Sequence, residues 1–192
     1  MGKKYKCALT EQFLIKNELY KFSYHKEYGL LFDLNFVLTG DKEIFICKSA
    51  EIKEWFNQYF FNKNLGINFD NLKLSQIKSQ ILKEYSNKIL TLIALAKKSG
   101  KLILGKTKVK NEIKNKEKDG IIIQALDASY REKFKNNEKY FILEEFNSNI
   151  ISSYIGTENT HYGFLYGDFF EQVFKFTREK KLFEEIDEIN DR

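Results

Sequence analysis

The chain has 192 residues, a formal net charge of +5 and a hydrophobic fraction of 43%. That length fits one ordinary domain or two small ones, and 18 Phe and 11 Tyr residues supply enough apolar surface for a core, which argues against global disorder. No apolar run reaches the length of a membrane span, and the opening MGKKYKC lacks the apolar region of a secretion signal. We therefore expect a cytoplasmic protein with no membrane partner.

Residues 1–61 have the pattern of a small α+β domain. Residues 19–24 and 30–33 form a candidate hairpin, and residues 43–47 form a third strand. Ser49 is a candidate N-cap for a helix whose apolar positions are Ile52, Trp55, Phe56 and Tyr59. A unit of this size is marginally stable alone. Residues 62–85 are predicted to be a linker and the start of a long helix over 75–98, whose apolar residues follow a 3.6-residue period.

Residues 86–181 alternate between strand-like and helix-like patterns. Strands are predicted at 102–104, 121–126, 140–143 and 162–166, and helices at 106–117, 128–136, 144–155 and 168–181. Asp127 and Ser129 offer N-cap oxygens to the second of these helices. Alternation of this kind predicts a sheet covered on both faces. The fold class is therefore α/β: a C-terminal three-layer αβα sandwich preceded by a small α+β domain of a β-hairpin plus a helix. Residues 182–192 are read as an acidic tail.

Lysines cluster in the middle of the chain. Between residues 97 and 118 there are nine lysines and two glutamates, a net charge of +7 in a chain whose total is +5. Lysine is abundant throughout and proline is absent, as an AT-rich coding bias would produce, so only the clustering is informative. Candidate nucleic-acid contacts are Lys97, Lys98, Lys101, Gly105, Lys106, Thr107, Lys108, Lys110 and Asn111. Free amide groups at the start of the 106–117 helix attract phosphate, whereas lysine there opposes the helix dipole. The alternative is a solvated face.

A loop of small and amide-bearing residues follows the 144–155 helix. It contains Gly156, Thr157, Asn159 and Thr160, which offer backbone, hydroxyl and amide groups to unpaired RNA bases. Loops at one edge of an alternating sheet gather together, so this loop and the start of the 106–117 helix are candidates for one surface. An ordinary turn is the alternative.

Motifs of catalysis and metal binding are missing from the sequence. There is no phosphate-binding glycine loop, nucleophile elbow or HExxH pattern. Cys7 and Cys47 are far apart and lack CxxC partners, so two reduced thiols are favoured over a disulfide or a metal site. His25 and His161 cannot complete a zinc site. We expect no enzyme activity, no metal and no cofactor.

The segment from residue 86 to 180 resembles the kink-turn-binding ribosomal protein superfamily (L-seven-Ae and L-thirty-e-like proteins). The shared features are the run LxxLAxxSGKLxxG, the apolar strand ending in Asp-Ala-Ser at 127–129, and IGTENTHYGFL from residue 155. The resemblance implies an αβα sandwich whose RNA surface combines the helix after Gly105 with the loop after Gly156. Thr107, Lys108 and Asn111 stand where kink-turn binders often have Asn or Lys, Glu, and Lys.

Residues 3–59 are similar to the small YlxR family. Lys6-Cys7-Ala8-Leu9-Thr10 matches that family's K-C-x-x-T, and the strands LYKF and FICKS follow in order. The family usually carries Gly-Arg-Gly before the last strand. Here Gly40-Asp41-Lys42-Glu43 occupies that position, which leaves Lys42 to replace the arginine. The resemblance implies links to RNA, including ribonuclease P RNA, and to nucleoid-associated regulation.

Together these features predict a non-enzymatic cytoplasmic RNA-binding protein of the bacterial translation or RNA-processing machinery. Its partner would be a structured RNA such as ribosomal or ribonuclease P RNA, with possible association with the ribosome or the transcription machinery. The alternative is a nucleoid-associated transcription regulator or a protein-interaction module. Salt dependence of binding and preference for structured RNA over duplex DNA separate these hypotheses.

Overall fold

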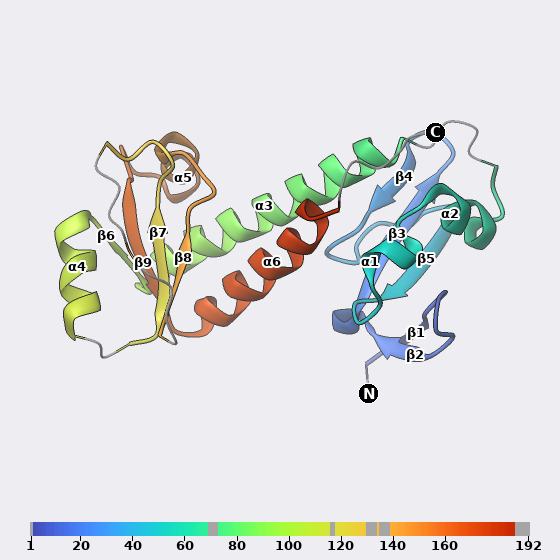
Figure 1. Cartoon of the computed structure of the whole chain (residues 1–192), viewed down its shortest axis with the longest axis horizontal. Coiled ribbons are helices and arrows are strands. Elements are labelled where there is room, and N and C mark those ends of the chain that lie inside the picture. Colours follow the sequence, from blue (N-terminus) through green and yellow to red (C-terminus); the bar gives the residue numbers. More distant parts are fainter. Residues whose placement is uncertain (1, 69–72, 116–117, 130–133, 135–138, 187–192) are drawn as a thin grey trace. The chain divides into compact units, whose positions relative to one another are not determined.

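A computed structural model describes residues 2–68, 73–115, 118–129, 134 and 139–186 of the chain. The contacts divide the protein into two compact units, and the mixed α/β class is confirmed. The first unit comprises residues 1–85 together with 180–192, and the second comprises residues 86–179. Figure 1 labels the elements of both units.

The first unit contains two antiparallel sheets. Strands β1 (Lys4–Lys6) and β2 (Phe13–Ile15) form a two-stranded ribbon. A 3-10 turn, η1 (Lys16–Glu18), leads into β3 (Leu19–His25), which pairs with β4 (Gly29–Phe32) on one side and β5 (Lys42–Cys47) on the other. The predicted hairpin and third strand are confirmed.

The helix predicted behind Ser49 is two helices, α1 (Ile52–Trp55) and α2 (Gln58–Leu65). The side chain of Asn57 accepts a hydrogen bond from the Phe60 amide at 2.9 Å and so caps a new helix within the expected one. The break changes the helical register, and Tyr59 is 73% exposed instead of facing the core.

Aromatic rings fill the core of the first unit. Trp55, Tyr20, Phe22 and Phe61 are essentially inaccessible to solvent. Phe183 joins them, with its ring centre 5.4 Å from that of Tyr20. Residue 183 thus belongs to a folded core, although the acidic tail was expected to begin at residue 182. Helix α6 (Asp168–Glu184) continues past residue 182, and Phe183, which lies within the acidic stretch, packs into the apolar core.

Helix α3 (Leu74–Lys98) is one residue longer than predicted and contributes to both units. Ile77, Ile81, Tyr85 and Ile89 recur every four residues and are all buried, as the apolar period predicts. The helix belongs to the first unit up to Tyr85 and to the second unit from Ser86 onward.

The second unit is built on a four-stranded sheet of order β6-β9-β7-β8. Its strands are β6 (Leu102–Leu104), β7 (Gly120–Gln124), β8 (Tyr140–Leu143) and β9 (Tyr162–Tyr166). The β7–β8 pair is parallel, and the other two pairs are antiparallel.

Successive residues of β7 enter different cores. Ile121 and Ile123 pack with residues of α3, α6 and α5 (Ser148–Ile155), whereas Ile122 packs with Val109 of α4 (Lys106–Asn115). Since alternate side chains of a strand point to opposite faces, both faces of the sheet are covered. In Figure 1, α4 lies on one side of this sheet and the second-unit parts of α3 and α6 lie on the other.

The bounds of several predicted elements of this unit differ from the structure or fall partly outside the described residues. The helix expected over 144–155 begins at Ser148, and the strand expected over 121–126 ends at Gln124. Of the helix expected over 128–136, residues 128, 129 and 134 are not helical, and the remaining positions lie outside the described residues. The described part of α4 ends at Asn115, so the last two residues of the 106–117 prediction also fall outside it.

Asp127 caps a helix, but not the one predicted. Its carboxylate accepts hydrogen bonds from the amide and the hydroxyl of Ser148, at 2.8 and 2.7 Å, at the start of α5. These two bonds, the hydroxyl first, hold the pKa of Asp127 below its ordinary value. The sequence identified Asp127 as a capping side chain for the helix directly after it, whereas the partner that the structure describes lies 21 residues away.

Candidate nucleic-acid interface

A pocket of about 490 Å³ lies in the second unit, where α4 begins and the loop after α5 passes. Its lining residues are Leu104, Gly105, Lys106, Ala128, Ser129, Thr157, Glu158, Asn159, Thr160, His161 and Tyr162. Five of the predicted site residues thus meet here: Gly105, Lys106, Thr157, Asn159 and Thr160. The two separate stretches that the sequence singled out form one surface.

Gly105 connects β6 to α4 at the edge of the pocket. Its amide donates to the Tyr162 carbonyl at 3.0 Å, and its carbonyl accepts from the Val109 amide at 3.0 Å, which starts the helical hydrogen bonding. Its φ of +100° is a conformation that favours glycine. A Cβ at this position would meet nothing within 4 Å. The backbone at the start of α4 is therefore open to close approach by a ligand.

The first two turns of α4 carry three lysines, of which Lys106 lines the pocket. Val109 is fully buried and fixes the helix against the sheet. Thr107, Lys108 and Asn111 are exposed, while Lys106 and Lys110 are half-buried. The Lys106 ammonium lies 5.7 Å from the centre of the Tyr162 ring. The helix N-terminus and these lysines attract anions to the same place.

Ser152 of α5 organises the loop that closes the pocket. Its carbonyl accepts hydrogen bonds from the amides of Gly156 and Thr157, and its hydroxyl accepts from the amide of Thr160 at 2.8 Å. The hydroxyls of Thr157 and Thr160 lie 2.7 Å apart. Thr160 is buried, and these hydrogen bonds hold the loop in place beside the pocket. Asn159 is exposed, with a left-handed φ of 48°.

Of the predicted lysines of the second unit, Lys106 lines the pocket, whereas Lys108 and Lys110 lie further along α4 and three others lie outside α4. Lys97 donates to the carbonyls of Ile155 and Gly156, at 2.6 and 3.5 Å, and so caps the C-terminus of α5. The Lys101 ammonium lies 5.4 Å from the Tyr166 ring centre, at the opposite end of β9 from Tyr162. Lys98 is exposed on the last turn of α3. Lys97, Lys98 and Lys101 are close to the pocket in sequence but are not among its lining residues.

Two further predicted residues have structural roles. Gly156 ends α5 with a left-handed φ of 64° and does not line the pocket. Lys42 lies in the first unit, where its ammonium donates to the Leu65 carbonyl at 2.5 Å and the Gly66 carbonyl at 3.3 Å. That ammonium stabilises the C-terminus of α2.

Six pocket residues were absent from the predicted site: Leu104, Ala128, Ser129, Glu158, His161 and Tyr162. Glu158 and His161 belong to the loop that the sequence had singled out, but neither was counted as a contact. Ser129 was predicted only as a helix N-cap, and Tyr162 only as part of a strand. Gln124 of β7 pairs with Tyr162 of β9, and this pairing brings Tyr162 and the segment after β7, which includes Ser129, to the same pocket. Glu158 places a negative charge on the loop side of the pocket, opposite in sign to Lys106 on the α4 side.

The two cysteines adjoin each other in the first unit. Both are free and buried, and the Cys7 sulfur accepts a hydrogen bond from the Cys47 amide at 3.1 Å. Burial acts to raise the pKa of Cys7, but hydrogen bonds from Thr10, Leu9 and Cys47 outweigh it and lower the pKa to about 7.

Within the described residues, no cluster of three or more His, Cys, Asp or Glu side chains could hold a metal ion. In the same part of the chain, none of the helices has the length and apolar content that crossing a bilayer requires. Comparison with protein-family models, with curated proteins and with solved structures finds no match for this chain.

Proposed function

We propose that this chain is a non-enzymatic, cytoplasmic RNA-binding protein of the bacterial translation or RNA-processing machinery. Its second unit would be an αβα sandwich of the kink-turn-binding ribosomal protein type and its first unit a YlxR-like domain. The partner is a structured RNA such as ribosomal or ribonuclease P RNA, and no cofactor is needed. The supporting observation is the pocket, which combines an open helix N-terminus, a lysine-bearing helix and an exposed amide.

The pocket offers RNA two kinds of contact. Lys106 and Lys108, with the amides at the start of α4, suit phosphate oxygens, which fix position without reading sequence. Asn159 and the Ser129 hydroxyl suit base edges or 2′-hydroxyls, which carry the discrimination. The open space beside Gly105 lets a backbone or base approach closely. An unpaired, irregular RNA element satisfies both sets of groups better than a regular duplex does.

A charge reversal on α4 tests the proposal. Replacing Lys106, Lys108 and Lys110 together by Glu exchanges three positive charges on the first two turns of α4 for three negative ones. Release of each counterion raises the binding affinity by a little under a factor of ten at 0.1 M salt, so we expect the affinity for structured RNA to fall roughly 10²- to 10³-fold. The slope of log affinity against log salt should decrease in magnitude by about two to three. Fluorescence anisotropy with a labelled RNA over a salt series measures both quantities.

The matched control is Lys26, Lys53 and Lys63, all exposed in the first unit and changed together to Glu. This variant has the same net charge as the first. Equal losses of affinity in the two variants would mean that RNA responds to total charge and not to α4. Unchanged affinity in the α4 variant, with an intact circular dichroism spectrum, would refute the proposal.

A second candidate function is protein interaction, and α5 favours it. This helix has no charged residue, although 31% of the chain is charged. Ile150 and Tyr154 are 43% and 38% exposed on it. Replacing Ile150 by Ser leaves the α4 charges in place. If the partner is RNA, the Ile150→Ser variant binds RNA with unchanged affinity, and an excess of duplex DNA does not displace the RNA.

A further inference from the structure

The β1–β2 ribbon of the first unit has two chemically different faces. Its strands pair with Tyr5 opposite Leu14, and these two side chains point inward. The Tyr5 ring stacks on Phe45 at 4.5 Å between ring centres, and Leu14 packs on the cluster around Cys7. The inward face therefore fixes the ribbon to the rest of the unit.

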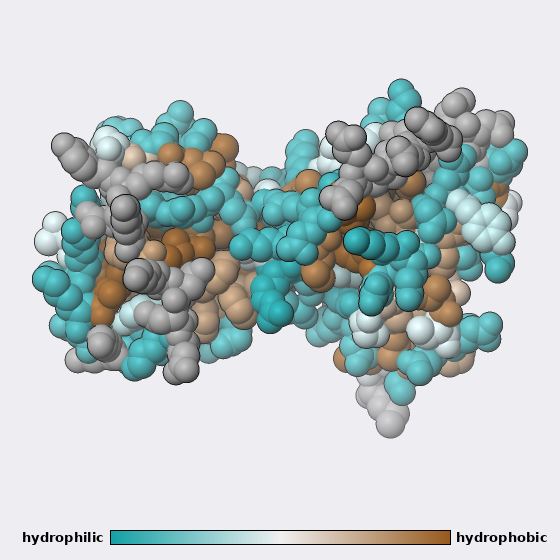
Figure 2. All heavy atoms as spheres, in the orientation of Figure 1, coloured by the Kyte–Doolittle hydropathy of each residue, from teal (hydrophilic) through white to brown (hydrophobic). Residues whose placement is uncertain are grey.

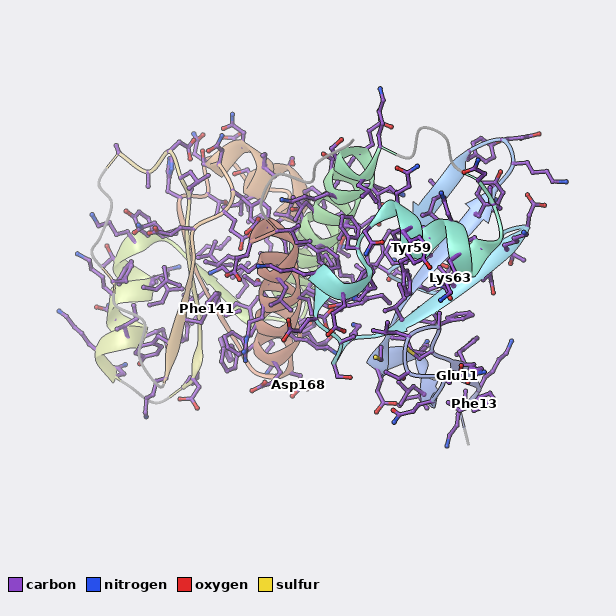
Figure 3. All side chains as sticks on the ribbon, turned by 45° about the vertical axis from the view of Figure 1, so that its right-hand side comes forward. Glu11, Phe13, Tyr59, Lys63, Phe141 and Asp168 are labelled. Carbon is purple, nitrogen blue, oxygen red and sulfur yellow. The ribbon has the colours of Figure 1, made fainter. Side chains whose placement is uncertain are left out.

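The outward face carries two lysines and two large apolar side chains. The register places Lys4 opposite Ile15 and Lys6 opposite Phe13. Phe13 is 65% exposed and Ile15 is 40% exposed. Figure 3 labels Phe13 on this ribbon, and Figure 2 shows hydrophobic and hydrophilic atoms intermixed there, at the lower right of the view. Since the inward face already anchors the ribbon, these exposed apolar groups add nothing to the core.

We propose that this outward face binds single-stranded nucleic acid. The Phe13 ring stacks on an unpaired base, and Lys4 and Lys6 contact phosphates. An aromatic ring beside lysines is the arrangement that binds single strands without sequence preference, because every base has a flat face. The inference concerns the first unit and goes beyond the function proposed for the α4 pocket.

The geometry of the ribbon suits an extended strand. Directly paired residues have Cβ atoms about 5 Å apart, so Lys6 lies beside Phe13. Lys4 and Lys6 are two residues apart on one face, about 7 Å along the strand, which lets them contact successive phosphates. Residues 3–16 contain four lysines and one glutamate, Glu11. Glu11 pairs with Lys6 at 3.2 Å, but both are exposed, so a phosphate can replace it.

Two other partners fit less well. A regular duplex hides its base faces and leaves nothing for the Phe13 ring to stack on. A membrane surface needs a larger apolar area than two side chains provide. Both remain as outcomes of the test.

The experiment uses the full chain carrying the Lys106, Lys108 and Lys110 to Glu changes, so that binding at the α4 pocket does not obscure the measurement. The probe is a fluorescein-labelled 12-nucleotide oligouridylate at 0.1 M salt. Phe13→Ala should lower affinity roughly 5- to 150-fold, the range for loss of one base–aromatic stack, and leave the salt slope unchanged. The matched control is Tyr59→Ala, which removes an aromatic ring that is 73% exposed on α2 and should have no effect. Figure 3 labels both rings.

Changing Lys4 and Lys6 together to Gln should reduce the magnitude of the salt slope by about 1.4, since each phosphate contact on a single strand contributes about 0.7. The control changes Lys26 and Lys53, which are also exposed, to Gln. Because Phe13 and both lysines are exposed, thermal unfolding should show all variants folded.

Three results would overturn the inference. The first is no binding of the oligouridylate, or equal binding by the Phe13→Ala and Tyr59→Ala variants. The second is binding of a 12-base-pair duplex with the same affinity as the oligouridylate, provided that Phe13→Ala does not change the affinity for the duplex. The third is Phe13-dependent binding of vesicles with 30% phosphatidylglycerol without Phe13-dependent binding of the oligouridylate. The comparison of the ribbon variants does not depend on binding at α4, because Lys106, Lys108 and Lys110 are replaced in every sample.

Discussion

Asn159 offers the sharpest test of the loop, because its amide and its backbone conformation can be separated. The residue lines the pocket, is exposed, and has a φ of 48°. Asn159→Gly removes the amide and keeps a backbone that glycine adopts freely. Asn159→Ala removes the same amide and also strains the backbone, because a Cβ disfavours the left-handed region.

The two variants should differ in stability and agree in binding. Holding alanine in the left-handed conformation costs about 1 kcal/mol, which lowers the melting temperature of a unit of this size by about 4–8 °C. Glycine should cause little or no loss. If the amide bonds to RNA, both variants lose a hydrogen bond worth about 0.5–1.5 kcal/mol, which is roughly a 2- to 13-fold loss of affinity. The salt slope should not change, since no charge is removed.

The assay compares two RNA hairpins, one that carries a kink-turn and one in which that loop is fully paired. Fluorescence anisotropy gives the affinity of the wild-type protein and of each variant for both hairpins. We expect Asn159→Gly to lose affinity only for the first hairpin. If Asn159→Gly binds both hairpins as the wild type does, Asn159 serves only the turn, and the reasoning about base recognition is wrong.

Two further predictions concern stability. Phe183→Ala should destabilise the first unit by about 3–5 kcal/mol, because the ring is fully buried, whereas Leu182→Ala, at a position 48% exposed, should have little effect. The single tryptophan, Trp55, lies in this core and reports its urea unfolding, and an unchanged midpoint for Phe183→Ala would contradict the core assignment. Asp127→Asn should lower the stability at pH 7. Because the folded-state pKa of Asp127 is lowered by Ser148, the carboxylate stabilises the fold above its unfolded pKa near 3.8, and this contribution is lost as the pH falls below that value. The difference between wild type and variant should therefore shrink between pH 5 and pH 3, and a constant difference would exclude the hydrogen bonds as its cause.

The sequence predicted elements well where a local period was strong. The four-residue recurrence of Ile77, Ile81, Tyr85 and Ile89 gave α3 to within one residue. Patterns that depend on a single capping residue were less informative. Asn57 begins a second helix inside an apolar period that looked continuous, because a side-chain cap can interrupt a helix without changing its composition.

The candidate site was predicted in part. Gly105, Lys106 and the loop around Asn159 were recognised from composition, and the fold brings them together. Lys97 and Lys101 were included on the same grounds, yet one caps α5 and the other lies over Tyr166. Charge in a sequence gives no direction to a side chain, so a cluster of lysines along the chain does not have to be a cluster in space.

The sequence by itself determined where helices and strands form in most of the chain, because helical and strand periods depend on residues three or four apart, or two apart, along the chain. It also determined that positive charge concentrates between residues 97 and 118. Only the tertiary structure decided that Phe183 completes the core of the first unit, that Asp127 caps α5, and that Tyr162 faces Lys106. These choices follow from the order and register of strands and from filling a core. They are long-range packing solutions, which depend on the whole chain at once and leave no periodic signal in any one segment.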